Sequence, residues 1–483
     1  MPIVKGKSLD RRRHLRGWWG CVALALAVHW PMAALGQGRA EPDSFLNQQR
    51  TIERLIQDQR AALDVPGEDV GFDYGGYYSF FLFLYDDGTN SSRTFRRHDL
   101  RIWSRLTLDQ GAHEFYARSR LGFVDFNPGD DFGTEDDVEG MDLERGFYKF
   151  DLAKEVRAKR GGTLPYNVEF KIGRDFTEFG TGLVLSRALD QVWVQTTYGP
   201  WQARWLAGKT VGSSQDLDIG RNVDRTRRTF LGVDARYKGF ERHEPFAYLL
   251  WQRDHNTDNV PTLFQKFDYD SFYTGLGSTG EVVTNLRYST EWVFETGHGY
   301  GDRRFLHNNR INAWAWDVGL EYLMPGKGTP RMGVEYIFAS GEPDRLFSPT
   351  DAAGGVSRGF RDEGFNGFGY RDTGLSFAPT LSNVHVWRAG TSFFPFEEHD
   401  YFKRLELGTN WFLYYKHHAD AGVSDALAGI QSGYLGWEMD YFANWDITSD
   451  VAATTRYGIF FPGKAFEDQT TRTYLLFGLT WNF

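Results

Sequence analysis

Paired acidic side chains are the residues of this sequence whose spacing most resembles catalytic chemistry. Glu291 and Glu295 lie four residues apart, and Glu438 and Asp440 lie two residues apart. Two carboxyl groups on either side of a sugar linkage can hydrolyse it, one as the acid and the other as the base or nucleophile. The same spacing arises wherever a β-strand turns a polar face toward water, because alternate residues share a face. We therefore do not expect glycoside hydrolysis.

Other patterns that could support chemistry are weak. The chain has no His-Glu-x-x-His or Walker motif. His417 and His418 begin a predicted loop with no evident third ligand, so we expect them to face solvent. The acidic segment 125–137 lacks the ligand order of an EF-hand, which favours a solvated loop over a Ca²⁺ site. We expect no enzyme activity, no cofactor and no metal site.

Residues 1–36 have the pattern of a secretory signal peptide. Six basic residues and one acidic residue flank an apolar run over 18–30, and Ala34-Leu35-Gly36 fits a cleavage site. The run is too short for a spanning helix. Removal of residues 1–36 takes away Cys21, the one cysteine, and shifts the net charge of the chain from −10 to about −15. An acidic, exported chain suits the outer membrane of a Gram-negative cell and argues against nucleic-acid binding.

Residues 37–69 are expected to form a periplasmic helical segment. Within it a helix is predicted over 44–64, where Ser44 can cap the start and Pro66-Gly67 ends it. Its apolar seams span fewer than three heptads and include two glutamines, which argues against a strong coiled coil. The helix is expected either to pack against the periplasmic mouth or the interior of a barrel, or to join copies of the chain in a coiled coil.

From residue 70 to residue 483 the hydrophobic period becomes two, which is typical of β-strands. Aromatic residues make up 17% of the chain, yet its mean hydropathy is only −0.49. Aromatic side chains outside and charged side chains inside are the pattern of a transmembrane barrel. In 286–296, for example, the outer set is Leu286, Tyr288, Trp292 and Phe294, and the inner set includes Arg287, Glu291 and Glu295.

The pattern therefore predicts an all-β fold, a single transmembrane antiparallel β-barrel of about 18 strands over residues 70–483. Every second connection is short, and 341–381 is the longest loop. The last strand ends on Phe483, which resembles the assembly signal of bacterial outer-membrane barrels. The expected strands are 74–86, 98–109, 112–125, 143–154, 166–175, 190–198, 201–210, 227–239, 244–254, 269–277, 284–296, 311–323, 330–340, 382–395, 402–416, 433–446, 450–461 and 471–483.

The residues expected to face the lumen are mainly basic in the first half of the barrel and acidic later. Arginines at a constriction concentrate and select anions; the alternative is that these charges only hydrate the pore and pair across it. The early basic set includes Arg101, Arg105, Arg118, Arg120, Arg145, Lys149, Lys171, Arg204 and Arg236, and the later acidic set is Glu291, Glu295, Asp317, Glu321, Glu335, Glu406, Glu438 and Asp440.

Five short segments share a resemblance to one family. They are Asp99-Leu-Arg-Ile-Trp103, Leu143-Glu-Arg-Gly-Phe-Tyr148, Lys171-Ile-Gly-Arg-Asp175, Phe368-Gly-Tyr-Arg371 and the stretch from Arg456 to Gly463. In order, they resemble strands and loop ends of the alginate-export family of outer-membrane porins, which pass newly made anionic exopolysaccharide out of the cell. The resemblance runs in patches over residues 98–483.

The resemblance implies an arginine-lined pore for an anionic, alginate-like exopolysaccharide, embedded in the outer-membrane bilayer. A periplasmic scaffold of a polysaccharide synthase is a further expected partner, and loop 341–381 is a candidate gate or plug. One departure concerns Arg174, which the strand alternation places on the outer face and which precedes Asp rather than Gln. The predicted pore residues are Arg101, Arg145, Arg174, Arg371 and Arg456, with Arg118 and Lys149 added from the alternation.

Two other functions stay open. One is a general or anion-selective diffusion porin for small solutes, which could be a trimer through helix 44–64. The other is an outer-membrane enzyme, which the weak motifs disfavour. A conduit for a polymer should bind short oligosaccharides of that polymer, whereas a general porin should be indifferent to them.

Overall fold

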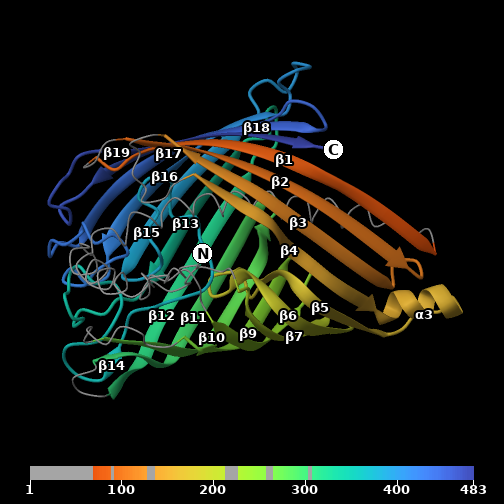
Figure 1. The fold of residues 1–483 in the computed structure, drawn as a ribbon, viewed down its shortest axis with the longest axis horizontal. Coiled ribbons are helices and arrows are strands. Elements are labelled where there is room, and N and C mark those ends of the chain that lie inside the picture. Colours follow the sequence, from red (N-terminus) through yellow and green to blue (C-terminus); the bar gives the residue numbers. More distant parts are fainter. Residues whose placement is uncertain (1–68, 89–91, 128–135, 213–226, 257–264, 303–306) are drawn as a thin grey trace, which may run out of the picture.

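The structure is a computed structural model that describes residues 69–88, 92–127, 136–212, 227–256, 265–302 and 307–483. The predicted signal peptide and helix 44–64 lie outside the described residues. Figure 1 shows one large barrel of tilted strands, which confirms the predicted all-β class.

Eighteen antiparallel strands close the barrel, and a short additional strand lies outside this set. The first strand, β1, pairs with β2 on one side and with the last strand, β19, on the other, so no long edge stays open. The additional strand, β14, runs parallel to β12. The strands are β1 (Val70–Asp86), β2 (Arg93–Leu108), β3 (His113–Phe126), β4 (Asp137–Asp151), β5 (Tyr166–Glu178), β6 (Ser186–Tyr198), β7 (Trp201–Thr210), β8 (Arg228–Tyr237), β9 (His243–Asp254), β10 (Gln265–Val283), β11 (Leu286–Asp302), β12 (His307–Leu323), β13 (Arg331–Ala339), β14 (Arg361–Asp362), β15 (Val384–Phe393), β16 (Leu405–Lys416), β17 (Tyr434–Asp446), β18 (Val451–Pro462) and β19 (Arg472–Asn482).

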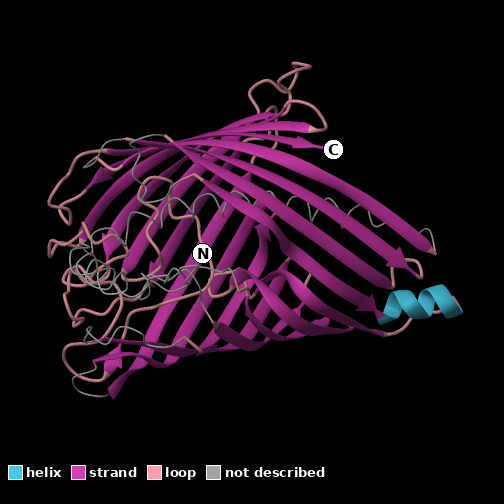
Figure 2. Ribbon diagram, viewed as in Figure 1, coloured by secondary structure: helices cyan, strands magenta, loops and turns pink. Residues whose placement is uncertain are grey.

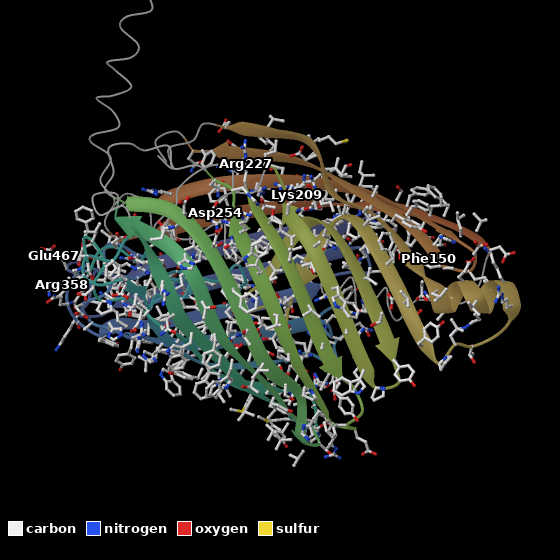
Figure 3. All side chains as sticks on the ribbon, turned by 90° about the horizontal axis from the view of Figure 1, so that it is seen from below. Phe150, Lys209, Arg227, Asp254, Arg358 and Glu467 are labelled. Atoms are coloured by element: carbon white, nitrogen blue, oxygen red, sulfur yellow. The ribbon has the colours of Figure 1, made fainter. Side chains whose placement is uncertain are left out.

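The connections differ between the two ends of the barrel. Short connections, such as Gly199-Pro200, gather at one end, which is the periplasmic end in barrels of this kind. Long loops gather at the other. In Figure 3, Phe150 marks the periplasmic end, and Arg358 and Glu467 mark the loop end.

One periplasmic connection contains the helix of the described chain, α3 (Leu152–Arg160), which Figure 2 shows projecting from the barrel end. Residues 155–165 were expected to form a plain turn, and this expectation was wrong. The Asp151 carboxylate accepts a hydrogen bond from the Lys154 amide, and Gly161 ends the helix at a φ of 64°. Among the described residues, no helix has the length and apolar character needed to cross a membrane.

Strand β10 is longer than expected, because the predicted strands 269–277 and 284–296 left 278–283 as a short connection. The strand instead continues to Val283, and Gly277 pairs with Glu291 of β11. A Cβ at Gly277 would lie 2.2 Å from the Phe246 ring. The absence of a side chain at Gly277 therefore leaves space for a neighbouring aromatic ring within the strand.

The two faces of the barrel wall differ sharply in exposure. Trp292 and Phe294 of β11 are 42% and 50% exposed, whereas Glu291, the residue before Trp292, is fully buried. Ile102 of β2 is 48% exposed and its neighbour Arg101 only 1%. An apolar outer face and a polar inner face match a barrel in a lipid bilayer, as the alternation predicted.

The loop between β13 and β15, residues 340–383, folds into the barrel interior. Phe368 contacts Phe230 of β8, and Phe377 stacks on Phe460 of β18 at 4.5 Å between ring centroids. These strands lie on different parts of the wall, so the loop spans the interior between them. A hydrophobic cluster that includes Phe365, Phe368 and Phe377 therefore fills part of the barrel.

A charge on the outer face should destabilise the barrel. Leu276 of β10 is 53% exposed on that face, and Leu276→Arg should cost about 2–4 kcal/mol of unfolding free energy, because arginine loses its hydration in lipid. Urea unfolding in lipid vesicles measures this cost. The control is Ser289→Arg on the inner face of β11, and an equal cost for both variants would contradict the assignment of the outer face to lipid.

Candidate functional site

Four neighbouring strands, β2 to β5, carry a set of inward basic side chains that we call the cationic wall. Each strand contributes at alternate positions, because the pleat returns every second residue to the same face. Four predicted pore residues belong to the cationic wall, namely Arg101, Arg118, Arg145 and Lys149. Arg105 and Lys171 complete it.

Glu144 joins the first two predicted arginines. Its carboxylate lies 3.0 Å from Arg101 Nε and 2.7 Å from Arg118 Nε. A register shift between β3 and β4 skips Glu144, since Arg118 pairs with Arg145 and Ser119 with Leu143. This bulge turns Glu144 inward beside Arg145. Period-two alternation places Glu144 outward, so sequence reasoning missed it.

The next strands continue the same pattern of pairing. Asp175 Oδ2 accepts a hydrogen bond from Lys171 Nζ at 2.7 Å, and Asp175 Oδ1 lies 3.6 Å from Arg145 Nη1. Lys149 Nζ lies 2.6 Å from Glu169 Oε2. The cationic wall is therefore a ladder of ion pairs in which each carboxylate serves one or two basic groups.

Arg174 lies away from this ladder. It shares a face of β5 with the exposed Ile172, and its Nε donates to Asp190 Oδ1 at 2.7 Å. Its Nη1 donates to the Leu143 carbonyl at 2.7 Å. The structure therefore places Arg174 on the outer face, where the alternation puts it, and the family resemblance alone suggests a pore role.

Arg371 comes from the inward loop, not from the wall. Its Nε lies 2.5 Å from Asp317 Oδ2 of β12, and its Nη2 lies 3.3 Å from Glu291 Oε2 of β11. Its Nη1 donates to the Thr181 carbonyl at 3.0 Å. These carboxylates raise the pKa of Arg371, although burial alone would lower it.

Backbone amides of the same loop neutralise another acidic residue. Glu438 of β17 accepts hydrogen bonds from the amides of Leu375, Ser376 and Phe377 at 2.6, 2.6 and 2.9 Å. Glu295 of β11 accepts one from the Asn366 amide at 2.9 Å. Charge-assisted bonds of this kind are stronger than neutral ones. The acidic residues on this side of the barrel therefore hold the loop.

The loop between β5 and β6, residues 179–185, completes this arrangement. The Thr181 amide donates to Glu291 at 2.9 Å. Gly180 has a φ of 60°, and a Cβ there would lie 2.6 Å from Glu291 Oε1. Only glycine fits so close to this carboxylate in a left-handed conformation. Sequence reasoning did not predict this contact between the loop and Glu291.

Arg456 of β18 lies on the opposite side of the strand closure from the cationic wall. Its guanidinium carbon is 4.9 Å from the centre of the Phe442 ring, and its Nη2 donates to Asn444 Oδ1 at 3.2 Å. Arg472 of β19 instead pairs with Asp425 of an outer loop at 2.5 Å. Barrel closure through β19 and β1 is as expected, and Arg472 belongs to the loop end.

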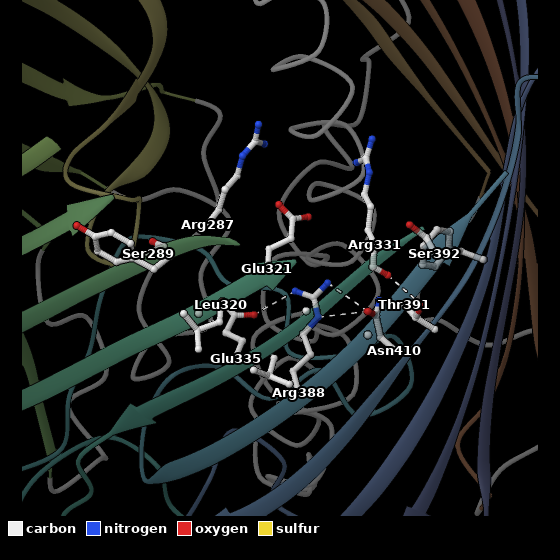
Figure 4. A pocket seen from close by; sticks show the side chains of 16 residues that line it. Arg287, Ser289, Leu320, Glu321, Arg331, Glu335, Arg388, Thr391, Ser392 and Asn410 are labelled. Atoms are coloured by element: carbon white, nitrogen blue, oxygen red, sulfur yellow. Dashed lines mark hydrogen bonds and ion pairs between the residues drawn. The ribbon is translucent and has the colours of Figure 1, made fainter. Parts of the chain in front are cut away.

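A pocket of about 340 Å³ lies against β11 to β16. Arg388 crosses it, with Nη1 3.1 Å from Glu335 Oε2 and Nη2 3.4 Å from Asp372 Oδ2 of the inward loop. Figure 4 shows the side chains of Arg287 of β11 and Arg331 of β13 extending on the same side of this pocket. The alternation predicted that Arg287 faces inward, but the sequence did not associate any of these arginines with a pocket.

The acidic pairs do not form a hydrolytic site in this structure. The first pair, Glu291 and Glu295, binds loop amides and hydroxyl groups, and Glu438 binds three amides. Ser357 stands in a Gly-x-Ser-x-Gly pattern within the inward loop, where its hydroxyl donates to the Asp344 carbonyl at 2.7 Å. It lacks the strand-to-helix turn that presents a nucleophile in hydrolases.

His417 joins the inward loop to the loop after β16. Its Nδ1 accepts a hydrogen bond from the Gly341 amide at 3.2 Å, and its ring contacts His418 and His385. It is partly buried rather than fully solvated, so that expectation was wrong. Burial, and next the neighbouring His418 and His385, lower its pKa from 6.5 to about 4.

A closed antiparallel barrel with an apolar outer face and a polar interior defines a β-barrel channel of the outer membrane. The fold and family are those of a channel rather than of an enzyme. The chain belongs to the Alginate export family, whose model matches residues 133–475, and this confirms the predicted resemblance. Membership implies passage of polysaccharide through a barrel in the membrane.

The fold is also similar to solved structures from Pseudomonas aeruginosa. OccK5 (OpdH) aligns with a TM-score of 0.53 at 12% identity, covering 85% of this chain and 98% of that chain. OccK8 (OprE) aligns with a TM-score of 0.51 at 12% identity, covering 85% of this chain and 98% of that chain. OccK11 (OpdR) aligns with a TM-score of 0.51 at 12% identity, covering 85% of this chain and 96% of that chain. At this identity the similarity supports the fold alone. No curated protein matches the chain.

Removal of Arg371 should release the inward loop. Arg371→Leu takes the cationic partner from Asp317 and Glu291, and breaking a buried ion pair typically costs about 3–5 kcal/mol. We expect faster hydrogen exchange across residues 340–383 and a noisier single-channel current. Arg358→Leu is the control, since Arg358 is an exposed residue of the same loop. Equal protection in wild type and Arg371→Leu would show that the loop is held by other contacts.

Acid should loosen the joint at His417. Undocked histidine takes up a proton near pH 6.5, whereas the docked ring does so near pH 4. Docking is therefore fully stable above pH 6.5 and weakens as pH falls from 6.5 to 4. Limited proteolysis of the inward loop at pH 7, 5 and 4 measures this. In His417→Asn the pH dependence should flatten; an unchanged profile would exclude His417 as its source.

Proposed function

We propose that this protein is a passive outer-membrane conduit that exports an anionic, alginate-like exopolysaccharide. The observation that supports this most is the unequal use of charge inside the barrel. Loop 340–383 occupies the carboxylates of Glu291, Asp317 and Glu438. The cationic wall on β2 to β5 lies apart from these contacts. Membership in the Alginate export family supports the class of substrate.

Ion pairing within the wall suits transport better than tight binding. A sugar carboxylate that approaches Arg101 or Arg118 must compete with Glu144 for the same guanidinium groups. Each exchange yields little net free energy, because one carboxylate replaces another. Conduction requires sites that attract a substrate and also release it. A row of exchangeable pairs would let a polyanion move from one basic group to the next.

The inward loop would set the width of the path and act as its gate or plug. Arg388 links Asp372 of this loop to Glu335 of β13. This link ties the loop to the pocket of β11 to β16. The chain shows no Walker motif, so the polymer would be driven by its synthase, through a periplasmic scaffold. We also propose that residues 1–36 are a cleaved signal, that 37–69 form a periplasmic helical segment, and that 70–483 make up the barrel.

A diffusion porin for small anions is the alternative function. The packing of Phe368 and Phe377 across the interior favours it, because a filled interior admits small solutes more readily than a polymer. The two functions differ in whether oligouronates bind inside the pore.

Charge reversal should test the proposed path. Arg101→Glu with Arg456→Glu replaces two of the inward cations, so the anion preference should be lost or inverted, because fixed charge sets the local ion concentration. Reversal potentials in a planar bilayer under a salt gradient measure the preference. Oligouronate should block the wild-type current and block the double variant at least about tenfold less strongly.

The control is Arg253→Glu, which changes an exposed residue of β9 by the same charge. Unchanged reversal potentials in a folded double variant would exclude Arg101 and Arg456 from the path. Anion selectivity without block by oligouronate would favour the diffusion porin.

A further inference from the structure

Three metal-binding side chains meet at the periplasmic end of the barrel, away from the proposed path. Asp109 lies in the turn after β2, His113 begins β3, and Glu155 lies in the first turn of α3. One ligand atom from each lies within 4.8 Å of the others. His113 Nε2 is 3.6 Å from Asp109 Oδ2 and 3.6 Å from Glu155 Oε2.

The imidazole of His113 is oriented by a neighbouring strand. Its Nδ1 lies 2.8 Å from the hydroxyl oxygen of Tyr148 on β4. When Nδ1–H donates to that oxygen, the lone pair of Nε2 is free and directed at the two carboxylates. Histidine ligands of metals commonly have their second nitrogen held in this way.

Glu155 supplies the second observation. Its Oε2 has almost no exposed surface, and it has no hydrogen-bond partner among the described residues. A buried oxygen without a partner is costly and calls for an explanation. The same atom is the one that lies 3.6 Å from His113 Nε2.

We propose that Asp109, His113 and Glu155 bind one divalent transition-metal ion, with Zn²⁺ as the best match. One imidazole and two carboxylates form a ligand set that Zn²⁺ accepts, with a fourth position for water. Bonds of about 2.0–2.1 Å in a tetrahedron place ligand atoms roughly 3.3 Å apart. The two distances of 3.6 Å need only a small contraction, and the two carboxylate ligand atoms, which lie within 4.8 Å of each other, would have to approach by up to about 1.5 Å. Mg²⁺ and Ca²⁺ prefer oxygen ligands alone.

Lys159 is the competitor for this site. Its ammonium lies 3.7 Å from Asp109 Oδ2 and bonds to Glu155 Oε1, while its side chain is 58% exposed. An exposed lysine can swing into water at little cost, and an exposed ion pair contributes little stability. A metal ion would therefore displace the ammonium and keep both carboxylates.

The bound ion would join the turn after β2 to helix α3. These segments are far apart in the sequence, so no local motif announces the site, and sequence analysis expected no metal. The ion would fix α3, and with it the connection between β4 and β5, against the periplasmic rim.

Calorimetry tests this site on the full mature chain, purified in detergent and stripped of metal with a chelator. Wild type should bind one more equivalent of Zn²⁺ than His113→Ala or Glu155→Gln. His243→Ala is the matched control, because His243 also begins a strand and bonds a tyrosine hydroxyl through Nδ1, at 3.0 Å from Tyr288. It should bind as wild type does. Heat-modifiable migration on gels confirms that each variant is folded.

Two more measurements separate a metal site from an ordinary ion-pair cluster. Lys159→Ala should bind Zn²⁺ about tenfold more tightly, because the competing cation is removed. Co²⁺ in place of Zn²⁺ should give the visible bands of a tetrahedral site in wild type, and His113→Ala should lose them. Equal Zn²⁺ stoichiometry in wild type, His113→Ala and Glu155→Gln would overturn the proposal, whatever the outcome for polysaccharide export.

Discussion

The neutralisation of buried carboxylates by loop 340–383 is the interaction on which the interior of this barrel depends. Glu291 and Asp317 share Arg371, and Glu438 accepts three loop amides. A carboxylate on the inner wall without water or a partner would be strongly destabilising. The acidic residues therefore fix where the loop lies, and the loop fixes how much of the lumen stays open. Wall and loop specify each other.

The cationic wall depends on this arrangement indirectly. Because the loop takes up the acidic residues of β11, β12 and β17, they are not available to pair across the lumen with β2 to β5. The basic residues pair instead with carboxylates on their own strands, such as Glu144 and Asp175. Pairs between adjacent strands keep the charges attached to the wall. The ion pairs of the basic residues described here are therefore made within the wall and not with the acidic residues that the loop holds.

The sequence predicted the outer face well because lipid imposes a simple rule on every strand. Trp292 and Phe294 are exposed where the alternation puts them, and the order of strands and the closure at β19 agree with the pattern. The inner face was less predictable. Glu144 needs a bulge to face inward, and β10 continues over 278–283, where it pairs with β11 instead of turning. Helix α3 was hidden by its shortness. The alternation cannot tell whether an inward carboxylate meets water or a folded loop.

Net charge is therefore a poor guide to what this barrel would carry. The whole chain is acidic, with a formal charge of −10, yet charges act over a Debye length of about 8 Å at physiological salt. A solute inside the barrel responds to the groups within that distance, and not to the total. Where the loop neutralises the carboxylates, their contribution to the local field is largely cancelled. What the solute meets is set by how the interior is filled, so the same strand sequence around a different loop would give a pore of different selectivity.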